Sequence, residues 1–183
     1  MGSIHLYSQI AAKKIDEHNH EGTRLILERI EKSSGEIIDK TSDAVWAVKA
    51  SNDTIENLFL RMEGYAASLL GEAGIQFTLE CKKELMLTKL TMDHRKNLFL
   101  VYKEAIHNII KYSQCNQVHI EITKQLHQIK LKITDDGIGF KLDHIHPYNG
   151  NGLKNMKERA EEMKGKFTIS STPGAGTTVE FII

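Results

Sequence analysis

The sequence predicts an α+β protein, in which a helical hairpin precedes a mixed, mostly antiparallel sheet with a layer of helices on one face. Two observations support this fold class. Residues 4–50 show helical periodicity, with apolar side chains three or four positions apart. Residues 51–183 follow the order helix, strand, helix, two strands, helix, two strands, which suits an α/β sandwich with its helices on one side. We therefore expect two domains, 1–50 and 51–183.

The first predicted helix, residues 4–19, carries one apolar stripe formed by Ile4, Tyr7, Ala11 and Ile15. A polar break at 19–22 separates it from a second helix. The stripe of that helix consists of Leu27, Ile30, Ser34, Ile37, Thr41, Ala44 and Val48. A hairpin this narrow cannot bury its stripe alone, so we expect two copies to pair into a four-helix bundle. The alternative is a hairpin that packs back on its own domain.

The second domain is predicted to open with a helix that begins at a capping box of Asp53 and Glu56 and ends near Gly71. A strand at 75–80 and a long helix from Asp93 to Tyr112 follow. The remaining predicted elements are strands at 117–123 and 127–134, a loop at 141–149, a helix at 152–164, and strands at 166–171 and 177–182.

Composition narrows the function classes. Lysine plus arginine and aspartate plus glutamate both number 24, so no basic excess argues for direct nucleic acid binding. Cys81 and Cys115 belong to no Cys-x-x-Cys pattern, which disfavours a zinc site and fits a reducing cytoplasm. No apolar run reaches the roughly 18 residues of a membrane span. We expect a cytoplasmic piece, whose parent protein can still be membrane-anchored upstream.

The most informative stretch follows the strand at 127–134, where Asp135 and Asp136 precede Gly137 and Gly139. Glycines let the main chain approach a flat or charged ligand, and a carboxylate at a strand end can accept a hydrogen bond from it. Taken alone, Asp-Asp-Gly is also typical of an ordinary hairpin turn. Three further stretches, at 104–112, 150–153 and 174–178, shift the balance towards a ligand site.

Glu104, Asn108 and Lys111 are spaced four and three residues apart, so on an α-helix they share one face. A carboxylate, an amide and an ammonium on one face suit a polar ligand, although a solvated helix surface is the alternative. Gly150 and Gly152 open the next helix, whose free amides are suited to phosphate. Arg159, later on that helix, could pair with phosphate or form a surface salt bridge.

Together, these stretches resemble the Asn box and the glycine boxes of the GHKL ATPases. They are most similar to the catalytic and ATP-binding domain of a two-component sensor histidine kinase with a short ATP lid. The resemblance covers 51–183, and 4–50 more loosely resembles the later part of a dimerisation and histidine-phosphotransfer hairpin. It implies a GHKL-type α/β sandwich that uses ATP and Mg²⁺.

The resemblance also implies residue roles. Asn108 would coordinate Mg²⁺, and Glu104 would orient or activate groups near the γ-phosphate. Lys111 would supply positive charge to the phosphates, and Asp135 would accept a hydrogen bond from the adenine amine. The other implied nucleotide contacts are Tyr112, Gly137, Gly139, Gly150, Gly152, Leu153 and Thr177. Asp136 is expected to face solvent or the turn.

A histidine kinase needs a phosphoacceptor histidine, typically followed by an acid, near the start of its first hairpin helix. Only His20-Glu21 has this pair, and it lies at the predicted hairpin tip. We therefore expect an acceptor upstream of Met1 and a fragment that binds ATP without phosphorylating itself. The implied partners are ATP or ADP, a response regulator receiver domain, and a second copy of the chain.

Two other classes were weighed against this interpretation. A GHKL nucleotide-binding interaction module, such as an anti-sigma-type Ser kinase or a degenerate domain, remains the main alternative, although the helical hairpin disfavours the anti-sigma type. A gyrase-like or chaperone-like ATPase needs additional transducer domains that this length does not hold. The sequence Gly-x-x-x-x-Gly-Lys-Ser/Thr is absent, which excludes a Walker P-loop.

Overall fold

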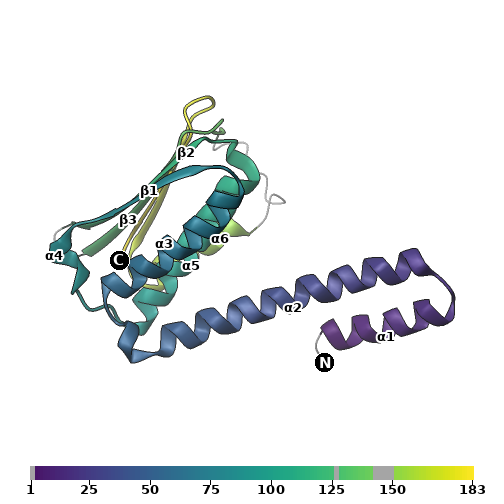
Figure 1. Cartoon of the computed structure of the whole chain (residues 1–183). Helices are drawn as coiled ribbons and strands as arrows, with labels where there is room; N and C mark the ends of the chain where they lie inside the picture. The colour runs from purple at the N-terminus through teal and green to yellow at the C-terminus, as the bar shows by residue number, and fades with distance from the viewer. Residues whose placement is uncertain (1–2, 126–127, 142–150) are drawn as a thin grey trace. The chain divides into compact units, whose positions relative to one another are not determined.

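The computed structural model describes residues 3–125, 128–141 and 151–183. The chain divides into two units, Met1–Val48 and Lys49–Ile183. The first is a helical hairpin, and the second is a sheet with helices (Figure 1). None of the helices in the three described ranges is both long enough and apolar enough to cross a membrane.

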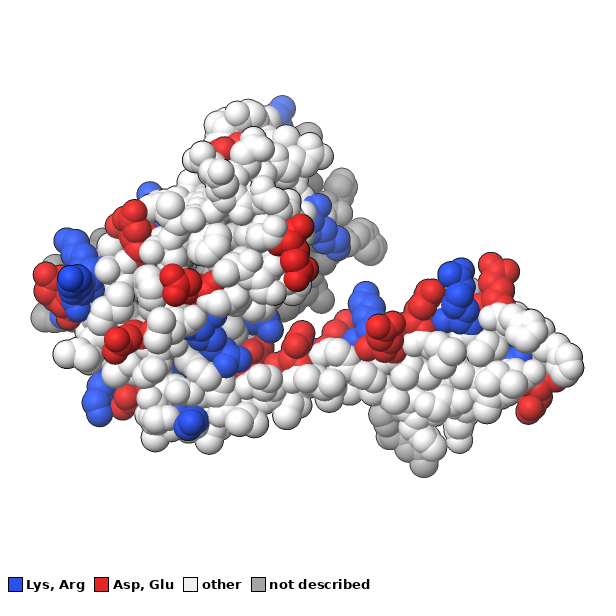
Figure 2. Space-filling view, in the orientation of Figure 1, with Lys and Arg blue, Asp and Glu red and all other residues white. Residues whose placement is uncertain are grey.

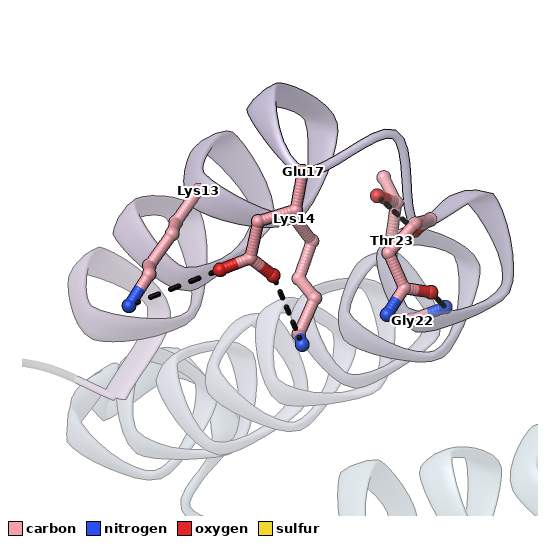
Figure 3. Close-up of polar contacts among 6 residues, drawn as sticks. Lys13, Lys14, Glu17, Gly22 and Thr23 are labelled. Carbon is pink, nitrogen blue, oxygen red and sulfur yellow. Dashed lines mark hydrogen bonds and ion pairs between the residues drawn. The ribbon is translucent and has the colours of Figure 1, made fainter.

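The hairpin consists of α1 (Ser3–Asp16) and α2 (His20–Val48). The connection is shorter than predicted, because α2 already begins at His20. Asn19 explains this start: its side-chain oxygen accepts the Gly22 amide at 2.8 Å, as an N-cap residue does. Just before the turn, Glu17 lies between Lys13 and Lys14, with N–O distances of 3.9 and 3.4 Å (Figure 3).

The predicted stripes are only partly covered within one copy of the hairpin. Ala11 is buried, and Ile4, Tyr7 and Ile30 are half-buried. A second set of apolar side chains remains at least 49% exposed, namely Leu6, Ile15, Leu25, Leu27, Ile37, Ile38, Val45 and Val48. Acidic and basic side chains intermix along α2 and over the second unit on the face shown in Figure 2.

The second unit contains a five-stranded sheet with the order β1-β2-β3-β5-β4. The strands are β1 (Gln76–Cys81), β2 (Gln117–Gln125), β3 (Gln128–Asp135), β4 (Lys166–Ser171) and β5 (Thr177–Ile182). β1 pairs with β2 in parallel, and the other pairs are antiparallel. The predicted mixed, mostly antiparallel sheet is confirmed.

Helices α3 (Ile55–Glu72), α5 (Met92–Asn108) and α6 (Gly152–Glu162) lie over one face of this sheet (Figure 1). The core lies between the layers, because alternate side chains of each strand point to the same face. Val118, Ile120 and Ile122 of β2 are buried with Leu131 and Ile133 of β3. The helices contribute buried Leu58, Met62, Leu98 and Tyr102.

Short elements whose form the sequence did not predict occur before α3, before α5 and after α5, where the helix predicted at 93–112 changes to a π-helical turn. They are the 3₁₀ turn η1 (Ala50–Asn52), the single turn α4 (Lys83–Met86) and the π-helical turn η2 (Ile109–Ser113). Each contains at most five residues, which is too few to produce a helical periodicity in the sequence.

The predicted capping box at Asp53 is wrong by one residue. Thr54 is the N-cap of α3, and its side-chain oxygen accepts the Asn57 amide at 3.3 Å. Thr54 stays extended because it forms a bridge with Lys89. Asp53 instead pairs with the Lys89 ammonium at 3.1 Å. The α3 helix therefore begins immediately after the Thr54–Lys89 bridge. The local sequence does not reveal this bridge.

Asp136 fastens the end of β3 to the beginning of β2. Its Oδ1 atom accepts the backbone amides of Asn116 and Gln117 at 2.8 and 2.9 Å. These two hydrogen bonds, Gln117 first, lower the pKa of the Asp136 carboxyl because they stabilise its ionised form. Asp136 is exposed to solvent, one of the two positions expected for it, and its carboxylate satisfies main-chain donors at the start of β2.

We predict that Asp136→Asn lowers stability at neutral pH, because a neutral amide oxygen is a weaker acceptor than a carboxylate. A lowered folded pKa gives stability that is present above the unfolded pKa and is lost as the pH falls through the folded value. The difference from the wild type should therefore shrink as the pH falls below the ordinary aspartate value of 3.8. Thermal unfolding at a series of pH values measures it. Asp39→Asn, at an exposed position of α2, is the control, and a pH-independent difference would contradict the prediction.

Candidate functional site

The polar stretches singled out in the sequence meet beside the carboxyl end of β3. Ile138, in the loop after β3, donates its amide to the Ser113 carbonyl at 2.8 Å, and its own carbonyl accepts the Gly174 amide at 2.7 Å. One loop residue therefore links η2 with the turn before β5. The start of α6 reaches the same region, where Gly152 packs against Glu104 of α5.

Each predicted site residue within the described part of the chain lies on one of these elements. Glu104 and Asn108 are on α5, Lys111 and Tyr112 on η2, Asp135 at the end of β3, Gly137 and Gly139 in the following loop, Gly152 and Leu153 at the start of α6, and Thr177 at the start of β5. Gly150 and residues 142–149 of the loop predicted at 141–149 lie outside the described residues.

Asp135 is the buried acid of this region, with 5% of its surface exposed. Its Oδ1 atom accepts the Gly137 amide at 3.0 Å. Burial raises the pKa of Asp135, and hydrogen bonds from the backbone amides of Gly137 and Thr177 oppose that rise. A carboxylate in such surroundings is a strong acceptor for one further donor, because little water competes with it.

Gly137, Gly139 and Gly176 are required by close packing of main chain on main chain. A Cβ atom at Gly137 would overlap the Ser113 carbonyl oxygen, and one at Gly176 would overlap the Asp135 carbonyl oxygen. Gly139 has a φ of 56°, and a Cβ atom there would overlap the Thr172 carbonyl oxygen. The sequence predicted ligand approach as the reason for Gly137 and Gly139, but the structure gives a reason internal to the fold.

Ser171 is a residue that the sequence analysis missed. Its hydroxyl oxygen accepts the Phe140 amide at 2.9 Å, donates to the Gly176 carbonyl at 3.0 Å and lies 2.9 Å from the Thr177 hydroxyl. It therefore holds the loop after Gly139 against the start of β5. No local signal marks it, because a serine at the end of a strand is common.

Glu104 and Asn108 lie one turn apart on α5, and both are half-buried. Lys111 follows Asn108 by three residues and lies in the π-helical turn η2, which rotates less per residue than an α-helix. Lys111 is exposed, and its ammonium lies 5.0 Å from the centre of the Tyr112 ring. A hydrogen bond with Tyr112 raises the pKa of Lys111.

The start of α6 is held close to α5. A Cβ atom at Gly152 would overlap the Glu104 Oε1 atom, so a larger residue there would displace the Glu104 carboxylate. Leu153 is half-buried. Arg159 donates to the Asn97 side-chain oxygen at 3.0 Å, which is neither the phosphate contact nor the surface salt bridge weighed from the sequence. Arg159 thereby links α6 to α5 two turns after Gly152.

A protein-family model matches the C-terminal half of the chain. Residues 93–183 match the family model described as histidine kinase-, DNA gyrase B-, and HSP90-like ATPase. All the site residues predicted from the sequence fall within this span. Membership of this family implies ATP binding.

The chain is similar to two curated bacterial sensor proteins. The chain is 30% identical over 112 residues to the sensor histidine kinase LiaS of Bacillus subtilis, covering 61% of this chain and 31% of the relative. It is 33% identical over 131 residues to the sensor protein VraS of Staphylococcus saprophyticus, covering 67% of this chain and 38% of the relative. The chain thus spans about a third of the length of these curated relatives.

Solved histidine kinase structures share the fold. The histidine kinase AdeS of Acinetobacter baumannii aligns with 99% of this chain and 94% of its own at a TM-score of 0.66 and 16% identity. The histidine kinase domain of the blue-light activated kinase of Erythrobacter litoralis aligns with 97% of this chain and 93% of its own at a TM-score of 0.62 and 16% identity. Residues 93–183 therefore belong to the histidine kinase-, DNA gyrase B- and HSP90-like ATPases, and the chain contains the catalytic ATPase domain of a two-component sensor histidine kinase.

Proposed function

We propose that the second unit binds Mg²⁺-ATP beside the end of β3 and transfers the γ-phosphoryl group to a histidine, from which it passes to a response regulator receiver domain. The observation that carries this proposal is the buried Asp135 carboxylate. It is fixed by the Gly137 amide at 3.0 Å and lies in the same cluster of loops as the end of α5. A buried acid costs stability unless it is satisfied, and an adenine amine is a donor that suits it.

At the base end, the chain offers one hydrogen-bond acceptor and a close-packed backbone. Asp135 would accept the exocyclic amine of adenine, whereas guanine presents a carbonyl there and would leave the carboxylate unpaired. Gly137 and Gly139 keep the loop within reach of the base. Thr177, opposite Asp135 in the sheet register, would complete the pocket beside the base.

At the phosphate end, the donor set fits a hydrated cation and a polyphosphate. Asn108 offers a neutral amide oxygen, a hard ligand that Mg²⁺ accepts. When bound, Mg²⁺ would neutralise charge on the phosphate oxygens. The amides of Gly152 and Leu153 at the start of α6 suit phosphate oxygens, and Lys111 and Tyr112 stand at the exposed margin. We propose Gly150 as a further contact from the sequence alone.

In the transfer step, an imidazole nitrogen attacks the γ-phosphorus, the bond to the β-phosphate oxygen breaks and ADP leaves. Glu104 would hold the proton of the attacking imidazole. This role is supported by the half-buried position of its side chain, one turn before Asn108 and against the start of α6. A carboxylate there would also orient the ring, which is the contribution that positioning makes to such reactions.

We predict that Mg²⁺-ATP or ADP raises the melting temperature by mass action. At a concentration 100 times the dissociation constant the stabilisation is about 2.7 kcal/mol, or several degrees. Asp135→Asn, which loses the charged acceptor, and Asn108→Asp, which loses the neutral ligand, should each remove most of the shift. Differential scanning calorimetry measures it, with Asp39→Asn as the control. Unchanged melting of the wild type at millimolar nucleotide would contradict ATP binding at this site.

We also propose that the acceptor histidine belongs to polypeptide outside these 183 residues. Among the histidines of the chain only His20 is followed by an acid, and it is the first residue of α2, at the turn of the hairpin. Labelled ATP should therefore give no acid-labile phosphohistidine on this chain alone, whereas a version extended upstream should become labelled. Label on the chain alone that His20→Gln removes would show that the acceptor has been misplaced.

The exposed apolar side chains of the hairpin support a homodimer. Burying them against a second copy would remove apolar surface from water at roughly 25 cal/mol per Å². We predict that the chain sediments as a dimer and that Leu27→Glu, which places a charge at a 53% exposed apolar position, shifts it to monomer. Lys32→Gln makes the same change in net charge at an exposed position of α2 and should leave the dimer intact. A wild-type monomer at micromolar concentration would exclude this partner.

A further inference from the structure

Ser113, the last residue of η2, is buried with 7% of its surface exposed. Its hydroxyl donates to the Ile109 carbonyl at 2.8 Å and accepts the Cys115 amide at 3.2 Å. One side chain thus connects the first residue of the π-helical turn with the segment that enters β2. The hydroxyl fixes the shape of this turn, because both of its partners are main-chain groups.

The main chain of the same residue faces the loop after β3. The Ser113 carbonyl accepts the Ile138 amide at 2.8 Å. Gly137 lies so close that a Cβ atom there would overlap this carbonyl oxygen. Ser113 therefore contacts both the end of the helix that carries Asn108 and the loop that begins at Asp135.

We propose that Ser113 is a positioning residue that sets the spacing between the Asn108 end and the Asp135 end of the nucleotide site. This inference rests on the proposed function of those two ends. A ligand that touches both ends gains from both only if their separation matches its own length, and residues behind a site usually fix such distances. The hydroxyl holds the turn, and the carbonyl holds the loop, so a change in the turn moves one end relative to the other.

Two ligands of different length distinguish the two ends of the site. Adenosine would contact only the Asp135 end, whereas Mg²⁺-ATP would span both ends. Ser113→Ala removes the hydroxyl and leaves the chemistry of the Asp135 and Asn108 side chains unaltered. We expect the dissociation constant for Mg²⁺-ATP to rise about tenfold, corresponding to the loss of a buried hydrogen bond. The dissociation constant for adenosine should stay within about twofold of the wild type.

Two further variants complete this titration experiment. Ser113→Thr keeps the hydroxyl and should restore most of the Mg²⁺-ATP affinity. Ser170→Ala removes a hydroxyl from an exposed position of β4 and should bind both ligands as the wild type does. Wild-type Mg²⁺-ATP affinity in Ser113→Ala, or equal losses for both ligands, would overturn the positioning role. Failure of the wild type to bind Mg²⁺-ATP would instead refute the proposed function on which the inference rests.

Hydrogen exchange measured on the wild-type chain tests the same coupling between the loop after β3 and the π-helical turn. This experiment does not require a variant to fold. Mg²⁺-ATP at saturating concentration should slow exchange at the Ile138 amide, which the Ser113 carbonyl accepts, and also at the Cys115 amide, which the Ser113 hydroxyl accepts. Protection by Mg²⁺-ATP that is confined to residues 135–139 would overturn the proposal, because the loop would then be ordered without any effect on the turn. Adenosine, measured in parallel, should protect the Ile138 amide and leave exchange at the Cys115 amide nearly unchanged.

Discussion

The burial of one carboxylate, that of Asp135, constrains most of the architecture around the site. A charge removed from water must be met by hydrogen bonds, and here the amides of Gly137 and Thr177 provide them. Both amides belong to main chain that can come this close only because Gly137 and Gly176 lack side chains. The glycines of the loops, the register of β3 with β5 and the Asp135 carboxylate therefore depend on one another. A change in any one of them would disturb the other two.

The sequence predicted the elements with long periodic patterns and missed those defined by contacts between distant residues. The five strands and the α3, α5 and α6 helices are found within a few residues of their expected bounds, because each repeats its apolar pattern over several positions. The N-cap at Thr54 coincides with a bridge to Lys89, and the π-helical turn at residues 109–113 packs against the loop at Gly137. Local residue preferences contain neither piece of information.

The site shows the same division. Asp135, Gly137 and Asn108 could be selected because their residue types and order resemble a known family. Ser113 and Ser171 could not, because a hydroxyl that bonds to main chain leaves no mark in the sequence. Lys111 was placed by α-helical spacing, whereas the structure puts it in the π-helical turn that follows Asn108. Sequence thus identifies the residues that are expected to contact a ligand. It identifies less well the residues that position them.

The π-helical turn has a consequence for what the segment between Asn108 and Gln114 encodes. Such a turn accommodates one residue more than an α-helical turn does. The chain direction after α5, and the left-handed Gln114 that ends the turn with a φ of 53°, therefore depend on how many residues the segment contains as well as on which residues they are. In this stretch the number of residues helps to determine the structure. A sequence alignment of related chains that places a gap there would align residues whose side chains point in different directions.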